Sequence, residues 1–129
     1  MKVNIGKYPN HRFYHNWLYN WFGYSPKQRT RIKIHNYDTW SMDYTLAHII
    51  LPMLVQLKAT KHGYPADLTE QEWDDILDEM IWAFEQKCRD DWMEDYDYNK
   101  WDSEGAKAHQ ERISNGFRLF GRYYENLWD

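Results

Sequence analysis

The sequence predicts a mainly α fold of the α+β class: three long helices, one short N-terminal helix and a small two-stranded β ribbon in a single domain, 1–129. Apolar residues recur at spacings of three and four in two stretches, and a third stretch is apolar almost throughout, which predicts the long helices. The ribbon is predicted by the alternation of basic and apolar residues in RTRIKIHN, Arg29 to Asn36.

The N-terminal part is expected to combine a strand with the short helix. Lys2 to Ile5 is the strand, and a helix follows over His11 to Phe22, with Asn10 as its cap and Gly23 as its end. Strict alternation from Arg29 to Asn36 then predicts a half-buried strand, which pairs with the first one. Its inner face is Thr30, Ile32 and Ile34, and its outer face is Arg29, Arg31, Lys33 and His35.

The next helix is predicted from Trp40 to about His62, with Asp38 or Thr39 as its cap and Gly63 as its end. It is apolar on nearly every side. Such a helix is either central in a fold or part of an oligomer interface. Pro52 lies inside it and should bend it, because proline removes a helix hydrogen bond.

The remaining two helices have clear signals. TEQE at Thr69 to Glu72 is a capping box, and apolar residues follow it at helical spacing: Trp73, Ile76, Leu77, Met80, Ile81, Phe84 and Cys88. The acidic, aromatic run from Arg89 to Trp101 has no periodicity and predicts a loop. A last helix begins at Asp102 or Ser103, with one apolar stripe: Ala106, His109, Ile113, Phe117, Phe120, Tyr124 and Leu127.

Composition excludes several classes of protein. No secretory leader and no apolar run of membrane-spanning length are present, and the single cysteine excludes an intrachain disulfide, so we expect an intracellular protein without membrane contact. Aromatic residues make up 19% of the chain, more than a small core requires, so some should line surfaces or interfaces. Charge is polarised: residues 1–64 hold nine Lys and Arg against two acidic residues, and residues 65–129 hold seven against eighteen.

The basic outer face of the second strand is the candidate ligand-binding site. Arg29, Arg31 and Lys33 point the same way at a spacing of about 6.6 to 7 Å, which suits successive phosphate groups. His35 would donate a hydrogen bond, and Arg12 is a candidate fourth cation. The aromatic residues Tyr37 and Trp40 would stack on a base. The alternative is a solvated edge strand whose charges prevent aggregation.

The net charge of −4 argues against long nucleic acid, because the acidic half would repel a polyanion. A small phosphorylated ligand suits a confined basic site better. The same charge polarity suits homo-oligomers in which a basic face meets an acidic one.

No catalytic residue, metal site or cofactor is predicted. His11 and His15 have the spacing of a metal pair, but no third ligand accompanies them. Asp43 with His48, or Asp38 with His35, could form a general base, yet no nucleophile motif or phosphate loop accompanies either pair. Whether the protein is an enzyme stays open at this point, with binding favoured over turnover.

Three stretches resemble a family of small proteins encoded by tailed bacteriophages, including marine ones. They are YDTWSMDYTLAHIILPMLVQLKATKHG at Tyr37 to Gly63, EMIWAFEQK at Glu79 to Lys87 and NGFRLFGRYYENLWD at Asn115 to Asp129; with the N-terminal KVNIGKYPNHRFYHNWLYNWFGYSPKQ the resemblance covers nearly the whole chain. Members of that family carry a longer segment where this chain has only Tyr64 to Leu68, so no role of that segment carries over.

The resemblance implies a phage accessory protein acting in the host cytoplasm, and it brings no activity with it. Our leading hypothesis is a homo-oligomer that sequesters a nucleotide-like ligand and so counteracts host nucleotide-signalling immunity. One alternative is a module that inhibits a host protein through its acidic, aromatic segment, with four anchors: Trp92, Tyr96, Tyr98 and Trp101. Another is a small hydrolase of a phosphorylated signal that uses His48 or His35 as its base.

Overall fold

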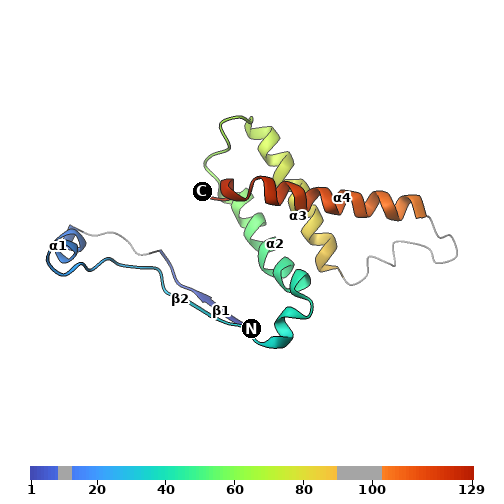
Figure 1. Cartoon of the computed structure of the whole chain (residues 1–129). Helices are drawn as coiled ribbons and strands as arrows, with labels where there is room; N and C mark the ends of the chain where they lie inside the picture. Colours follow the sequence, from blue (N-terminus) through green and yellow to red (C-terminus); the bar gives the residue numbers. More distant parts are fainter. Residues whose placement is uncertain (9–12, 90–102) are drawn as a thin grey trace. The chain divides into compact units, whose positions relative to one another are not determined.

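The computed structural model describes residues 1–8, 13–89 and 103–129. Over these residues the fold is mainly helical, with four α-helices and one small antiparallel sheet of two strands, as predicted (Figure 1). The chain divides into two compact units, Met1–Ser41 and Met42–Asp129. That the whole chain forms one domain stays a prediction.

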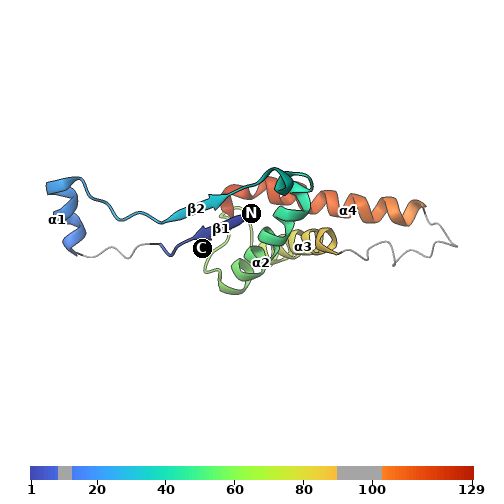
Figure 2. The ribbon, with the colours of Figure 1, turned by 90° about the horizontal axis from the view of Figure 1, so that it is seen from below.

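The first unit is a β ribbon that carries a helix. Strand β1 (Lys2–Ile5) pairs antiparallel with β2 (Thr30–Lys33), and α1 (Phe13–Phe22) lies between them in sequence. The predicted pairing is therefore confirmed, with a second strand shorter than expected. Within this unit, α1 lies at the end of the ribbon remote from the N-terminus (Figure 2).

Helix α1 ends where the sequence predicts. Gly23 has a φ of +65°, a conformation that only glycine adopts without strain, and its N–H donates to the Tyr19 carbonyl at 2.9 Å. The predicted cap Asn10 and the first predicted turn, residues 11 and 12, lie outside the described residues.

The start of the next helix differs from the prediction. Residues Asn36–Thr39 form a 3-10 helix, η1, and α2 begins at Met42 and runs to Thr60. Asp38 does not cap α2, because its carboxylate accepts the His35 N–H at 2.7 Å and pairs with the Met1 amino group at 3.0 Å. The expected caps Asp38 and Thr39 are thus wrong, since both side chains serve η1 or its surroundings: the Thr39 hydroxyl donates to the Asn36 carbonyl.

The second unit is built around the middle one of its three described α-helices. Helix α3 (Glu70–Cys88) packs against α2 and against α4 (Ser103–Arg122), and a 3-10 turn, η2 (Tyr124–Asn126), follows α4 (Figure 1). The core is formed by Ala47, Leu54, Trp73, Leu77, Met80, Phe84 and Tyr123. Four of these come from the apolar stripe that predicted α3, so that stripe is confirmed as the core face.

The predicted capping box of α3 is present. Thr69 accepts a hydrogen bond from the Glu72 N–H, and the Glu72 carboxylate accepts the Thr69 N–H at 2.7 Å. This backbone hydrogen bond, with one from the Thr69 hydroxyl, lowers the pKa of Glu72.

Helices α3 and α4 approach closely at one point. A side-chain carbon on Gly116 would lie 2.3 Å from the Ala83 Cβ and 2.9 Å from the Glu79 carbonyl oxygen. Only glycine fits there. Beside this contact, Arg112 makes two hydrogen bonds to Glu79 and lies over the ring of Trp82 at 3.8 Å.

No described helix has both the length and the apolar character needed to cross a membrane.

Candidate functional site

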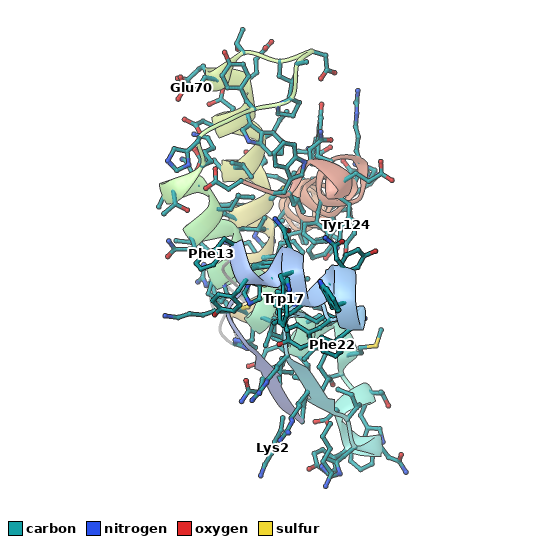
Figure 3. All side chains as sticks on the ribbon, turned by 90° about the vertical axis from the view of Figure 1, so that its left-hand side faces the viewer. Lys2, Phe13, Trp17, Phe22, Glu70 and Tyr124 are labelled. Atoms are coloured by element: carbon teal, nitrogen blue, oxygen red, sulfur yellow. The ribbon has the colours of Figure 1, made fainter. Side chains whose placement is uncertain are left out.

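The strand register gathers four cations on one face of the ribbon. Lys2 is opposite Lys33 and Asn4 is opposite Arg31, and directly opposed residues of an antiparallel pair share a face. The Gly6 N–H donates to the Arg29 carbonyl at 2.8 Å, which extends the pairing by one residue and adds Arg29. We call Lys2, Arg29, Arg31 and Lys33 the basic face. Figure 3 shows Lys2 extending from the ribbon.

The basic face carries uncompensated charge. All four side chains are exposed, and in the described part of the chain none of them has an ion-pair partner. Asp38 is the only acidic residue in the sequence of Met1–Ser41. The hydrogen bond from the His35 N–H lowers the pKa of Asp38, and the pairing with the N-terminal amino group lowers it further. The Asp38 carboxylate therefore pairs with the Met1 amino group and the His35 N–H and does not pair with the basic face.

The other face of the ribbon is apolar and exposed. Val3, Ile5, Ile32 and Ile34 have exposed fractions of 44, 56, 55 and 52%. All four residues of β2 are exposed, so the predicted half-buried strand is wrong: within Met1–Ser41, the described helix α1 does not pack on its inner face. None of the described residues of Met1–Ser41 is buried, and Phe13, Trp17 and Phe22 along α1 are also exposed (Figure 3).

Aromatic rings adjoin the basic face. His35 follows Lys33 by two residues, and its ring stacks on Tyr37 with centroids 5.3 Å apart and planes 3° from parallel. Tyr37 is 57% exposed and Trp40 is 83% exposed, so both rings are open to a ligand.

Most of the predicted ligand residues therefore lie along one segment. Arg29, Arg31 and Lys33 share the basic face, and His35 and Tyr37 form a stacked pair directly after it. Trp40 follows η1. Arg12 lies outside the described residues. Lys2 was missed, although the alternation of polar and apolar residues in Lys2 to Ile5 is a signal that could have identified it.

A second polar group was not predicted. The His62 N–H donates to Asp129 Oδ1 at 2.6 Å, and His62 Nδ1 lies 3.0 Å from the same oxygen. These bonds, the backbone one first, lower the pKa of Asp129. The pair borders a pocket of about 480 Å³ lined also by Tyr64, Asn126 and Trp128.

This His62–Asp129 pair has the arrangement of an oriented general base. Catalysis also requires a nucleophile or a bound water aligned with it, and the pocket lining contains no serine, threonine or cysteine. The proposed pair of His48 with Asp43 has other neighbours: His48 packs against Tyr44, and Asp43 pairs with Lys87, which lowers the pKa of Asp43. Within the described ranges, no three His, Cys, Asp or Glu residues cluster as metal ligands.

The segment considered for protein binding, with Trp92, Tyr96, Tyr98 and Trp101, lies outside the described residues. No family model, curated protein or solved structure matches the chain. The functional argument therefore depends on the geometry of the basic face.

Proposed function

We propose that the protein binds a small phosphorylated, nucleotide-like ligand on the basic face and does not turn it over. The observation that carries this proposal is the set of four exposed cations on one ribbon face with no acidic partner in the described structure. Closely spaced cations without acidic partners attract small anions from solution. A ligand with two or more phosphates would replace several of these anions at once.

The spacing supports a ligand with more than one phosphate. Same-face residues along a strand are about 6.6 to 7 Å apart, and directly opposed residues have Cβ atoms about 5 Å apart. Lys2 and Lys33 thus form a pair across the ribbon, while Arg31 and Arg29 extend the row along β2. The guanidinium groups can each form two parallel hydrogen bonds to one phosphate.

The stacked His35–Tyr37 pair supports a ligand that also carries a base. An exposed ring that is already held parallel to its neighbour offers a flat surface, and stacking on such a surface contributes about 1 to 3 kcal/mol for each base. A phosphate chain on the basic face and a base near Tyr37 would place both parts of a nucleotide along one segment of the chain.

A role for such binding follows from the resemblance to phage proteins. Sequestration of a nucleotide signal in the host cytoplasm would counteract an immune response that depends on that signal. This role needs a binding site and no chemistry. The carboxylate nearest the basic face along the chain, that of Asp38, is already paired with the Met1 amino group and the His35 N–H.

Isothermal titration with adenosine triphosphate and with a cyclic dinucleotide tests the proposal. Arg31→Glu should weaken binding at least about tenfold, because one charge-assisted hydrogen bond contributes about 1.5 to 3 kcal/mol. Lys107→Glu changes the net charge equally on an exposed position of α4 and should leave binding unchanged. Equal binding by Arg31→Glu and the parent chain would contradict the proposed site, and nucleotide breakdown during the titration would contradict binding without turnover.

A further inference from the structure

The basic face is a row that begins beside aromatic rings. Lys33 is at one end of the row, next to the stacked pair of His35 and Tyr37, and Arg29 is at the other end. Extended backbone joins the two ends, so the row is about 13 Å long. A ligand that meets each cation in its own place must carry phosphates over a similar length, with its aromatic part at the Lys33 end.

The facing side of the ribbon changes along this row. Lys2 is opposite Lys33, whereas the next same-face positions on that side are Asn4 and Gly6. Positive charge is thus densest beside the aromatic rings, and the side chains of the facing side become shorter away from them. This gradient gives the site a direction, with room for a chain-like ligand to lie lengthwise along β2.

Two kinds of phosphate chain differ in their spacing. In a nucleoside triphosphate a single oxygen atom joins neighbouring phosphorus atoms, so the charge is gathered over a length shorter than the row. In a phosphodiester strand a sugar separates neighbouring phosphates, and this repeat has as many backbone bonds as two residues of polypeptide. An extended strand therefore repeats at about the 6.6 to 7 Å of same-face residues along β2.

Separate phosphates also suit the cations better than a single cluster. Arginine and lysine side chains are flexible and can converge on one triphosphate. Convergence brings like charges closer together and fixes more of each side chain, and both effects oppose binding. One phosphate level with each of Arg29, Arg31 and Lys33 requires neither change.

Two exposed rings adjoin the Lys33 end. Tyr37 lies in η1 and Trp40 is its C-cap, with the Trp40 N–H donating to the Tyr37 carbonyl at 3.4 Å. Residues three apart in a 3-10 helix lie above one another, about 6 Å apart along the axis. The two rings therefore start from the same side of η1 at nearly one nucleotide repeat. A mononucleotide has only one base to place on them.

We propose that the ligand of the basic face is a short single-stranded oligonucleotide, with about three phosphates along β2 and its terminal bases at Tyr37 and Trp40. This inference rests on the proposed function and narrows it to phosphodiester-linked ligands.

Charge limits the length of that strand. Lys and Arg outnumber acidic residues seven to one in residues 1–41, whereas residues 42–129 hold nineteen acidic residues against nine Lys and Arg. This acidic excess repels a polyanion that extends beyond the row. The ligand is therefore a short strand and not a long nucleic acid.

Two ligands of equal charge test the spacing. Thymidine triphosphate and the 5′-phosphorylated thymidylate trimer each carry three phosphates and the same formal charge, but only the trimer separates its phosphates by sugars. Isothermal titration of the full chain should give at least about tenfold tighter binding of the trimer, the effect of one further charge-assisted hydrogen bond. A trimer that lacks two of its bases has a single base, like the triphosphate. It should still bind more tightly than the triphosphate, because its phosphate spacing is unchanged.

Arg29→Gln tests the far end of the row. It should weaken the trimer about tenfold and the triphosphate less than about threefold, because a triphosphate held beside Tyr37 ends before position 29. Lys107→Gln removes one positive charge from an exposed position of α4 and is the control for net charge. It should change both affinities less than about twofold.

An eight-nucleotide thymidylate tests the length limit. Its additional registers should raise the affinity over the trimer by no more than about tenfold. Three results would overturn the inference and leave the proposed function intact: a triphosphate that binds as tightly as the trimer, an equal effect of Arg29→Gln on both ligands, or a larger gain for the eight-nucleotide strand. Failure of all these ligands to bind would contradict the proposed function itself.

Discussion

Replacing Gly116 with alanine tests the closest helix contact in the structure. The added carbon would lie 2.3 Å from the Ala83 Cβ, whereas apolar carbons pack at about 4 Å, so α3 and α4 must separate locally. Glu79 contributes a backbone oxygen at 2.9 Å, which cannot rotate away as a flexible side chain would. Overpacking of this kind costs about 1 to 3 kcal/mol.

The same substitution also stabilises helix α4 on its own. Alanine is better than glycine inside a helix by about 1 kcal/mol, so the net loss in unfolding free energy for Gly116→Ala is about 1 to 2 kcal/mol. Gly121→Ala supplies the control, since that position lies in the same helix and has no atom within 4 Å of an added carbon. It should be neutral or up to about 1 kcal/mol more stable.

Urea unfolding followed by circular dichroism at 222 nm measures both variants, and melting temperatures should fall by about 4 to 8 °C for each kcal/mol lost. Adding Ala83→Gly to Gly116→Ala removes the shorter clash but leaves the Glu79 oxygen, so recovery should be partial. If Gly116→Ala is as stable as Gly121→Ala, the two helices do not cross at the distance described.

Two other contacts give testable outcomes. Thr69→Ala should cost about 1 kcal/mol of unfolding free energy, because it removes the capping box of α3. Thr60→Ala is the control, because the Thr60 hydroxyl only donates to a carbonyl one turn back in α2. It should cost less than half as much in the same urea titration. Carbon-detected NMR should find the pKa of Asp129 below its ordinary value, largely retained in His62→Ala because the backbone N–H remains. Since the folded pKa is lowered, the stabilisation by Asp129 is present above the unfolded value of about 3.9 and is lost as the pH falls through the folded one; an Asp129 pKa at or above 3.9 would refute this hydrogen-bond arrangement.

Local signals predicted the elements that depend on neighbouring residues. The capping box and apolar spacing of α3 involve residues three or four apart, and both are confirmed. Gly23 ended α1 as predicted because its positive φ is a local requirement. The pairing of the two strands followed from their alternation.

Features that depend on distant residues were not predicted. The start of α2 was displaced to Met42 because Asp38 binds the Met1 amino group, 37 positions away. His62 and Asp129 are 67 positions apart, and no pattern links them. At the candidate site, alternation identified the cations of β2, but only the register placed Lys2 beside Lys33. The exposure of Ile32 was missed because alternation indicates two different faces and does not show that either one is covered.

The ion pairs between α2 and α3 also determine how these two helices can align. Asp43 near the start of α2 meets Lys87 near the end of α3, while Lys58 and Lys61 at the other end meet Asp78 and Asp74. In a parallel arrangement Asp43 would face those aspartates and the two lysines would face Lys87, so every pair would become repulsive. Ion pairs at or near the surface contribute little stability individually, about 0 to 1 kcal/mol, yet together they discriminate between the two orientations of the same apolar surfaces. The pattern of charges therefore selects one antiparallel alignment during folding, even though the apolar core supplies most of the stability.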